Sequence, residues 1–192
     1  MSKRILILLG HPDCRPERFG AALASAYADA ATAAGHDVRR IDLADIETPF
    51  LAGQWEFDSP PPPHIQAVQQ DILWANHIVL LFPLWLGATP AKLKALLQQV
   101  FRDGFGMETS PRGPVARLKG RSVRLIVTMG MPAIAFWLMF GAHGLLAVEK
   151  GILGLAGMKP IRKTVIGAVE SIGGRGRLKW LARMRRFGTL GV

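Results

Sequence analysis

The sequence predicts an α/β fold, a five-stranded doubly wound parallel sheet with helices on both faces, formed by a single domain over residues 1–192. Two observations lead to this prediction. Short apolar runs alternate five times with segments of helical periodicity, a pattern typical of parallel strands joined by helical crossovers. The length of 192 residues also suits one such domain with a complete core and leaves too little chain for a second.

An apolar strand and a helix open the chain. Residues 5–9 are only Ile and Leu, which indicates a central strand buried on both faces. The turn-rich loop of residues 10–18 leads into a helix whose apolar side chains share one face, and Gly35 is expected to end it. Residues 38–43 mix apolar and charged side chains, which predicts a second strand near an edge of the sheet.

A Pro- and Gly-containing segment, residues 45–62, is predicted to be a loop. Trp55 and Phe57 within it are unusual for a solvated connection, so we expect them to cover the domain or a partner subunit. Apolar residues at helical spacing then predict a helix over residues 64–75.

The stretch from residue 78 to 101 contains a strand, a loop and a helix in that order. The strand is apolar, the loop of residues 83–89 is broken by Pro and Gly, and the helix has a single apolar face. We expect Thr89 to cap this helix and Pro90 to be its first residue. Ligands of open α/β sheets bind at the loops that follow the carboxyl ends of such strands.

The remaining elements repeat the pattern. After an irregular excursion over residues 104–120, the sequence predicts a strand at 123–128, a helix at 145–155, a strand at 161–166 and a basic helix at 175–187. The chain therefore supplies the five strands and the intervening helices that a doubly wound domain requires.

Positive charge is concentrated in the later part of the chain. Residues 1–110 hold 9 Lys and Arg against 12 Asp and Glu, whereas residues 111–192 hold 15 against 2, which together make the formal net charge of +10. Such a field attracts phosphates, anionic lipid or nucleic acid, and a solvated basic surface is the plain alternative. Residues 175–186 show no nucleic-acid motif and have an apolar packing face, so we expect no nucleic-acid partner.

Cysteine content and the first residues favour a cytoplasmic protein. The single Cys14 excludes an intramolecular disulfide and fits a reducing compartment, and the chain begins with a strand rather than a signal peptide. Residues 125–148 lack charged side chains over a length that spans a bilayer, but Gly and Pro interrupt them, which argues against a membrane helix. A peripheral membrane contact through the basic C-terminal half stays open.

Three loops are candidates for the chemistry: residues 10–18, 83–89 and 128–132. They follow strands of one parallel sheet, so they meet at the same edge. The first precedes a helix N-terminus, which favours an anion, and it adds His11 and Arg18 as donors. The P-loop and Gly-x-Gly-x-x-Gly signatures are absent, which disfavours an ATPase and a Rossmann dehydrogenase. A flat aromatic cofactor with one phosphate, such as flavin mononucleotide (FMN), would use all three loops.

Motifs in these loops carry a resemblance. They are Gly10-His11-Pro12-Asp13, then Phe82-Pro83-Leu84-Trp85-Leu86-Gly87 followed by Pro90-Ala91 and Leu93-Lys94, and Val127-Thr128-Met129-Gly130-Met131-Pro132. Together they resemble the flavodoxin-like NAD(P)H:quinone oxidoreductase family over nearly the whole chain. The resemblance implies a flavodoxin-like fold, a bound flavin, a homodimer with the active site at its interface, and hydride transfer from a nicotinamide to a quinone in a ping-pong sequence.

The resemblance also implies roles for particular residues. FMN, or FAD as the alternative, would be held by His11, Arg18, Phe19, Pro83, Leu84, Trp85, Leu86, Thr128, Met129 and Gly130. Phe136 and Trp137 would form an apolar lid over the second substrate or pack in a dimer interface, and His143 would supply a proton or hydrogen bond. We expect no metal ion. Many relatives carry Ser or Thr where this chain has Arg18, and Gly where it has Met129.

The function predicted from the sequence is therefore a flavin-dependent NAD(P)H oxidoreductase with a small quinone-like acceptor. One alternative is a flavin-bearing accessory subunit of a membrane transport system, docked through residues 136–140 and the basic C-terminal half. Electron shuttling is another alternative, but true flavodoxins are typically acidic and this chain has a charge of +10.

Overall fold

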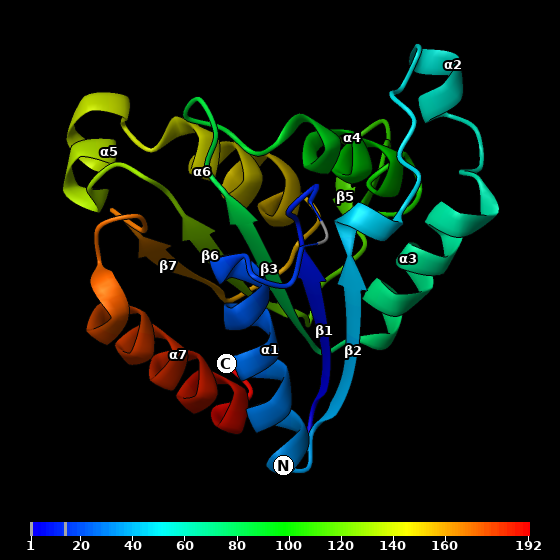
Figure 1. Cartoon of the computed structure of the whole chain (residues 1–192). Helices are drawn as coiled ribbons and strands as arrows, with labels where there is room; N and C mark the ends of the chain where they lie inside the picture. The colour runs from blue at the N-terminus through cyan, green and yellow to red at the C-terminus, as the bar shows by residue number, and fades with distance from the viewer. Residues whose placement is uncertain (1, 14) are drawn as a thin grey trace.

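A parallel sheet of five strands runs through the centre of the molecule (Figure 1). The computed structural model describes residues 2–13 and 15–192, so Cys14 lies outside the described residues. The strands are β1 (Arg4–Leu9), β2 (Asp37–Asp42), β3 (His77–Pro83), β6 (Ser122–Thr128) and β7 (Ile161–Ile166). Their spatial order is β2-β1-β3-β6-β7, and every neighbouring pair is parallel. This is the doubly wound order of flavodoxins, so the predicted fold class is confirmed.

Helices cover both faces of the sheet. One face packs against α1 (Phe19–Ala33) and α7 (Gly173–Leu190). The other packs against α3 (Pro63–Trp74), α4 (Ala91–Val100), α6 (His143–Val148) and the π-helical turn η2 (Glu149–Gly154). The two helical layers explain the continuous apolar run of β1, because successive side chains point to opposite faces and both faces are buried. Ile5 and Ile7 contact the α1 and α7 side, whereas Leu6 and Leu8 contact the other side.

A buried arginine lies beneath α7. Arg124 on β6 is nearly inaccessible, and its guanidinium stacks on the Phe187 ring at 3.7 Å. It donates hydrogen bonds to Thr164 Oγ1 on β7 and to the Val192 oxygen. One of the cations counted in the basic C-terminal half is therefore part of the core rather than of the surface.

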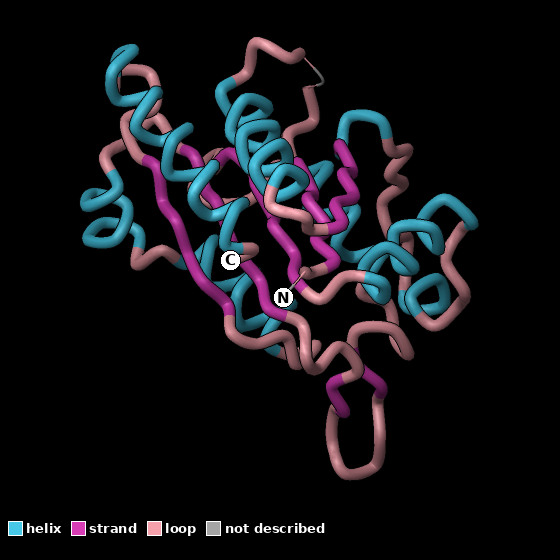
Figure 2. Tube along the Cα trace, turned by 90° about the horizontal axis from the view of Figure 1, so that it is seen from below, coloured by secondary structure: helices cyan, strands magenta, loops and turns pink. Residues whose placement is uncertain are grey.

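Three segments differ from the sequence prediction. The 3₁₀ turn η1 (Leu43–Asp45) ends where the 45–62 segment starts, and the short helix α2 (Gln54–Phe57) lies within that segment. The 104–120 excursion forms the antiparallel hairpin β4 (Met107–Glu108) and β5 (Val115–Ala116), which projects from the body of the molecule (Figure 2). The third is the helix α5 (Ala133–Phe140), where the sequence pattern predicts no regular element.

The start of α4 was also predicted incorrectly. Pro90 is the N-cap residue rather than the first helical residue, and no side chain caps the helix, so Thr89 does not have the predicted role. The first helical residue is Ala91, one position later than predicted from Pro90.

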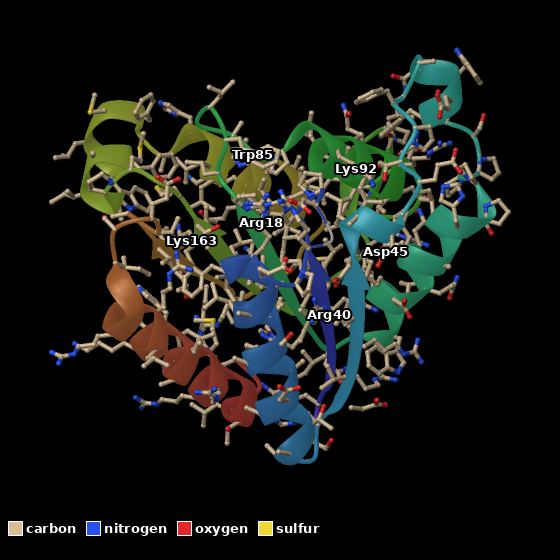
Figure 3. All side chains as sticks on the ribbon, in the orientation of Figure 1. Arg18, Arg40, Asp45, Trp85, Lys92 and Lys163 are labelled. Atoms are coloured by element: carbon tan, nitrogen blue, oxygen red, sulfur yellow. The ribbon has the colours of Figure 1, made fainter. Side chains whose placement is uncertain are left out.

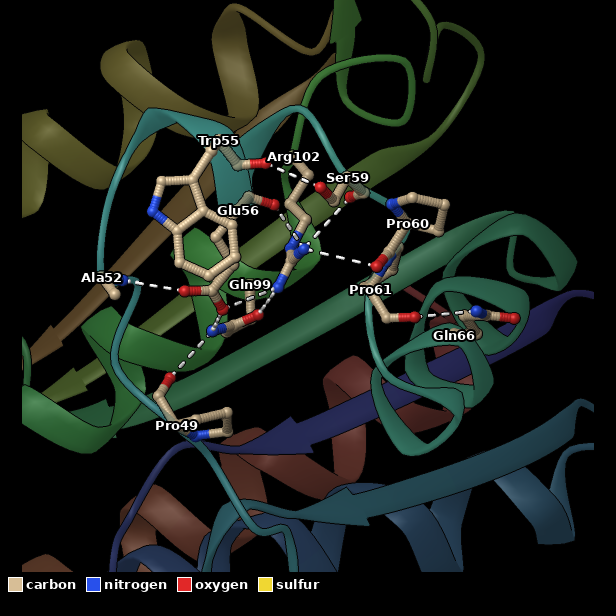
Figure 4. A network of polar contacts seen from close by, with 10 residues as sticks. All are labelled: Pro49, Ala52, Trp55, Glu56, Ser59, Pro60, Pro61, Gln66, Gln99 and Arg102. Atoms are coloured by element: carbon tan, nitrogen blue, oxygen red, sulfur yellow. Dashed lines mark hydrogen bonds and ion pairs between the residues drawn. The ribbon is translucent and has the colours of Figure 1, made fainter.

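Residues 46–62 form a strap across α4 that Arg102 holds in place (Figure 4). The Arg102 side chain is 2% exposed, pairs with Glu56 at 3.1 Å and donates to the main-chain oxygens of Glu56 and Ser59. Gln99 lies against the same guanidinium and donates to the Pro49 oxygen. Phe57 is half-buried at the inner side of the strap, whereas Trp55 is exposed.

No single helix in the described part of the chain is long and apolar enough to cross a membrane. Helix α5 and the helical segment of residues 143–154 reach that length and composition only together, and they are bent by 80° relative to one another.

Candidate functional site

The carboxyl ends of β1, β3 and β6 meet at a cavity of about 300 Å³. Five of the residues predicted to hold a flavin line it: His11, Arg18, Phe19, Pro83 and Thr128. Figure 3 labels Arg18 and Trp85, which both appear above the ends of the central strands in that view. The convergence follows from the topology, because parallel strands place all their C-terminal loops at one edge.

His11 begins the first loop with a defined orientation. Its Nδ1 accepts a hydrogen bond from the Asp13 N–H at 3.0 Å, so the neutral ring carries its proton on Nε2. Burial lowers the pKa of His11, and the nearby Arg18 and Arg15 act in the same direction against the Asp13 carboxylate. The ring is therefore neutral at physiological pH and keeps one N–H donor for a ligand.

Asp13 joins the two arginines of the loop. Its carboxylate accepts from Arg15 at 2.7 Å and from Arg18 Nη2 at 2.6 Å and Nε at 2.9 Å. These hydrogen bonds, those of Arg15 first, hold the pKa of Asp13 well below its usual range. Arg18 lines the cavity, but its guanidinium is already oriented by Asp13, so it offers a ligand only its remaining N–H groups.

The first helix leaves its N-terminus open to the cavity. Arg18 is the N-cap residue of α1, no side chain caps the helix, and its first turn contains no acidic residue. The first intrahelical bond runs from the Ala22 N–H to the Arg18 oxygen, so helix geometry leaves the preceding N–H groups without intrahelical acceptors. Phe19 and Gly20 line the cavity at this end, where the helix dipole favours an anion.

The second loop is a tight turn that presents Trp85. The Trp85 and Ala88 backbones exchange two hydrogen bonds of 2.9 Å, with Leu86 and Gly87 at positive φ between them. The Trp85 indole is half-exposed and meets the His11 ring edge-on at a centroid distance of 5.6 Å. Leu86 is fully exposed and has a φ of +48°. This backbone conformation is unfavourable for any residue that carries a Cβ atom.

Several predicted backbone donors are already engaged. The Leu84 N–H donates to the Thr128 oxygen at 2.7 Å, and the Met129 N–H donates to the Ile166 oxygen at 2.9 Å. Leu84 packs against the core and Met129 is buried in it. Gly130 is exposed close to Glu170, which lines the cavity. Thr128 is the residue of the third loop that itself forms the cavity wall.

The start of α7 contributes a residue that the sequence analysis missed. Arg177 lines the cavity, with its guanidinium 5.2 Å from the Phe19 ring and an Nη2 hydrogen bond to the Val169 oxygen at 3.3 Å. Val169 and Glu170 complete this wall. In the sequence, Arg177 is identifiable as a basic residue in the first turns of a helix that follows a core strand. The other basic residues around it equally favour a surface role, so the sequence alone does not single it out.

The predicted substrate residues do not line the cavity. Phe136 is completely buried in the core, so its role as a lid over a substrate is wrong in this structure. Trp137 is partly exposed and lies near Lys163 Nζ at 5.9 Å. His143 is exposed at the start of α6, where Gly144 closely approaches the Gly87 oxygen, so His143 lies beside the second loop. Across the described ranges, no three His, Cys, Asp or Glu side chains are grouped to hold a metal ion.

Comparisons with known proteins agree with this fold. A family model described as "Flavodoxin-like fold" matches residues 3–184. An uncharacterized NAD(P)H oxidoreductase from Haemophilus influenzae is 30% identical over 129 residues, which cover 65% of this chain and 63% of that relative. The chain thus matches less than two thirds of the length of this curated relative.

Solved structures agree as well. The NAD(P)H:quinone oxidoreductase from Methanothermobacter marburgensis has a TM-score of 0.81 at 20% identity, covering 98% of each chain. An FMN-dependent NADH-azoreductase from Bacillus anthracis, solved in complex with FMN, has a TM-score of 0.77 at 16% identity, covering 99% of each chain. At this level of identity these likenesses concern the fold.

The order of the strands defines a protein of the doubly wound α/β class, and its three-loop cavity lies at the switch point where such folds bind ligands. Within that class the chain belongs to the flavodoxin-like family, as its loop motifs indicated.

Proposed function

We propose that the protein is a flavin-dependent oxidoreductase that uses NAD(P)H to reduce a small quinone-like acceptor. The observation that carries this proposal is the joint placement of an open helix N-terminus, the His11 Nε2–H and the cation Arg177 around a 300 Å³ cavity. The family membership and the NAD(P)H-linked relative give it further support.

The donor set fits FMN. The N-terminus of α1 with Arg18 suits a phosphate, because N–H dipoles and a cation meet there without a capping carboxylate. In this proposal His11 and Phe19 would hold the ribityl chain, and Pro83 and Thr128 of the cavity wall, with Trp85 beside His11, would line the ring. FAD would need room for an adenosine. A second cavity of about 290 Å³ shares His11 and Arg18 with the first and extends toward Arg40.

When bound, a flavin supplies two-electron hydride chemistry between a reduced nicotinamide and an acceptor. The chain orients the bound group and sets its surroundings. Trp85 packs edge-on against His11, the neutral His11 can donate from Nε2, and Arg177 places a positive charge at the cavity wall. His143 lies beside the second loop, where its exposed imidazole can give a proton to an acceptor.

The edge of the sheet where the loops meet is exposed in a single subunit, which supports the further proposal of a homodimer. Trp85 and Trp137 are both partly exposed at the edge of the sheet where the loops meet. A second copy placed over this edge would cover them and complete the pocket for a flat acceptor.

The test begins with the purified protein and its visible absorption spectrum. We expect a flavin spectrum, FMN on extraction, bleaching by NADPH without oxygen, and turnover with a benzoquinone. A protein that stays colourless after incubation with FMN and FAD would refute the flavin proposal. Bleaching without turnover on any quinone would refute the catalytic role and favour an accessory one.

A further inference from the structure

Helix α5 exposes apolar side chains on most of its circumference. Its eight residues are all apolar, and Phe136 alone among them is buried. Ile134, Leu138 and Met139 are 70%, 80% and 75% exposed. A concentration of large apolar side chains of this kind marks an interaction surface.

The outward face of α7 is basic. Arg175, Lys179, Arg183 and Arg186 follow one another at helical spacing, and all four are exposed. The 18-residue helix contains no Asp or Glu, and Leu178 on the same face is 63% exposed. Cations and exposed leucines on one helix face are the combination found in helices that lie on a membrane surface.

The segments that precede α5 and α7 pack against one another. The loop before α7 packs directly on the start of α5, because Gly167 lies so close to the Ala133 N–H that no Cβ fits between them. The Ala168 N–H also donates to the Met131 oxygen at 2.9 Å. Figures 1 and 2 both show α5 and the beginning of α7 at the β7 edge of the sheet.

We propose that the exposed faces of α5 and α7, here called the α5–α7 surface, bind the surface of an anionic lipid bilayer. The apolar side chains of Ile134, Leu138 and Met139 enter the headgroup region, and the stripe from Arg175 to Arg186 contacts lipid phosphates. The second copy proposed above would lie over Trp85 and Trp137, whereas a symmetric contact over the basic stripe itself would bring two positive stripes together. These side chains are exposed whether or not a flavin is bound in the cavity.

The test is co-sedimentation of the full chain with vesicles. We expect binding to vesicles of phosphatidylcholine mixed with phosphatidylglycerol, and little binding to phosphatidylcholine alone. Binding to the anionic vesicles should weaken as salt rises from roughly 0.1 M to 0.5 M. The variant R175Q/K179Q/R186Q should bind about a hundredfold more weakly, or about fivefold for each charge removed. The variant I134S/L138S/M139S should also lose binding.

Matched controls lie elsewhere on the surface. Arg112→Gln removes an exposed charge in the hairpin segment, and Phe50→Ser removes an exposed aromatic on the strap, so both should bind like the parent. Circular dichroism and sedimentation velocity on every variant report folding and oligomeric state. Absence of vesicle binding, equal binding to neutral vesicles, or binding unchanged in both triple variants would overturn the proposal. So would an I134S/L138S/M139S variant that dissociates a dimer but keeps parental vesicle binding, since α5 would then be an interface between copies.

Discussion

The imidazole of His11 stands edge-on to the indole of Trp85, with ring centroids 5.6 Å apart and an interplanar angle of 84°. This contact joins the loop after β1 to the loop after β3, two segments separated by more than seventy positions in the printed sequence. Because Nδ1 of the same ring accepts the Asp13 N–H, the imidazole is held on two sides and its Nε2–H has a defined direction.

Replacing His11 with Ala should weaken flavin binding by up to about tenfold, since the hydrogen bond from its Nε2–H to the bound flavin is lost. Fluorescence titration of the apoprotein with FMN measures the affinity. His64→Ala is the matched control, because His64 is exposed on α3 away from the cavity. Equal FMN affinity in the two variants would contradict the role of His11.

Arg177→Ala should lower the affinity for FMN about tenfold and reduce its salt dependence, because a cation is removed from the cavity wall. Arg186→Ala removes the same charge from the outward face of the same helix and should leave affinity unchanged. Titrations of both variants at two salt concentrations provide the measurement. An equal loss in the two would show that only the general positive field matters.

Leu86→Asn should stabilise the fold by about 0.5–1 kcal/mol, because Asn tolerates the positive φ of this turn better than Leu does. Urea unfolding measures the change. Leu138→Asn is the control, since Leu138 is also exposed but lies in a helix. If Leu86 contacts the ring, as the loop motif implies, the stabilised variant will bind FMN more weakly; unchanged binding would remove Leu86 from the site.

The buried His77 should make stability depend on pH. Burial, followed by the charges of Lys3, Arg124 and Arg162, lowers its pKa to about 3, whereas the unfolded chain has the ordinary value of about 6.5. Between these values the unfolded state binds more protons, so the free energy of unfolding should fall by about 1.4 kcal/mol for each pH unit of acidification. Above about pH 6.5 His77 is neutral in both the folded and the unfolded state, so it no longer makes the free energy of unfolding depend on pH.

Urea unfolding at several pH values between 3 and 7 checks the slope. His77→Asn should be flatter over this range, whatever its absolute stability, and His64→Asn should keep the parental slope. A His77→Asn variant with the parental slope would assign the acid sensitivity to other groups.

Arg102→Met should destabilise the protein by about 3 kcal/mol, because the Gln99 side-chain oxygen and the main-chain oxygens of Glu56 and Ser59 lose their donor. The loss should be local as well as global, since the strap of residues 46–62 depends on this side chain. Limited proteolysis should therefore cut the strap faster than the rest of the chain. Arg117→Met, at an exposed ion pair on the hairpin, should change neither measurement.

How much the sequence predicts is clearest in the strands. The strands predicted at residues 5–9 and 123–128 agree with β1 and β6 within one or two positions. A strand that is buried on both faces needs apolar side chains at nearly every position, so its sequence is recognisable without knowledge of its neighbours. The edge position of β2 was equally visible, since its charged side chains need solvent. Parallel topology then places the three loops together, so half of the predicted cofactor residues line one cavity.

The local sequence pattern did not predict the role of a side chain whose contacts are with residues distant in the sequence. Phe136 lies in an apolar run that resembles an exposed lid, and only its packing in the core shows otherwise. Thr89 carries a capping signal that the actual helix start at Ala91 does not use.

The sequence by itself determined the alternation of strands and helices, and with it the doubly wound sheet and the edge where its loops meet. The tertiary structure alone decided which side chains face the cavity: that Arg177 reaches it from the last helix, that Asp13 orients Arg18, and that Trp85 contacts His11. The physical reason is that periodicity reports how much of a segment is buried. The direction of a side chain across a cavity depends on how elements far apart in the chain pack against one another.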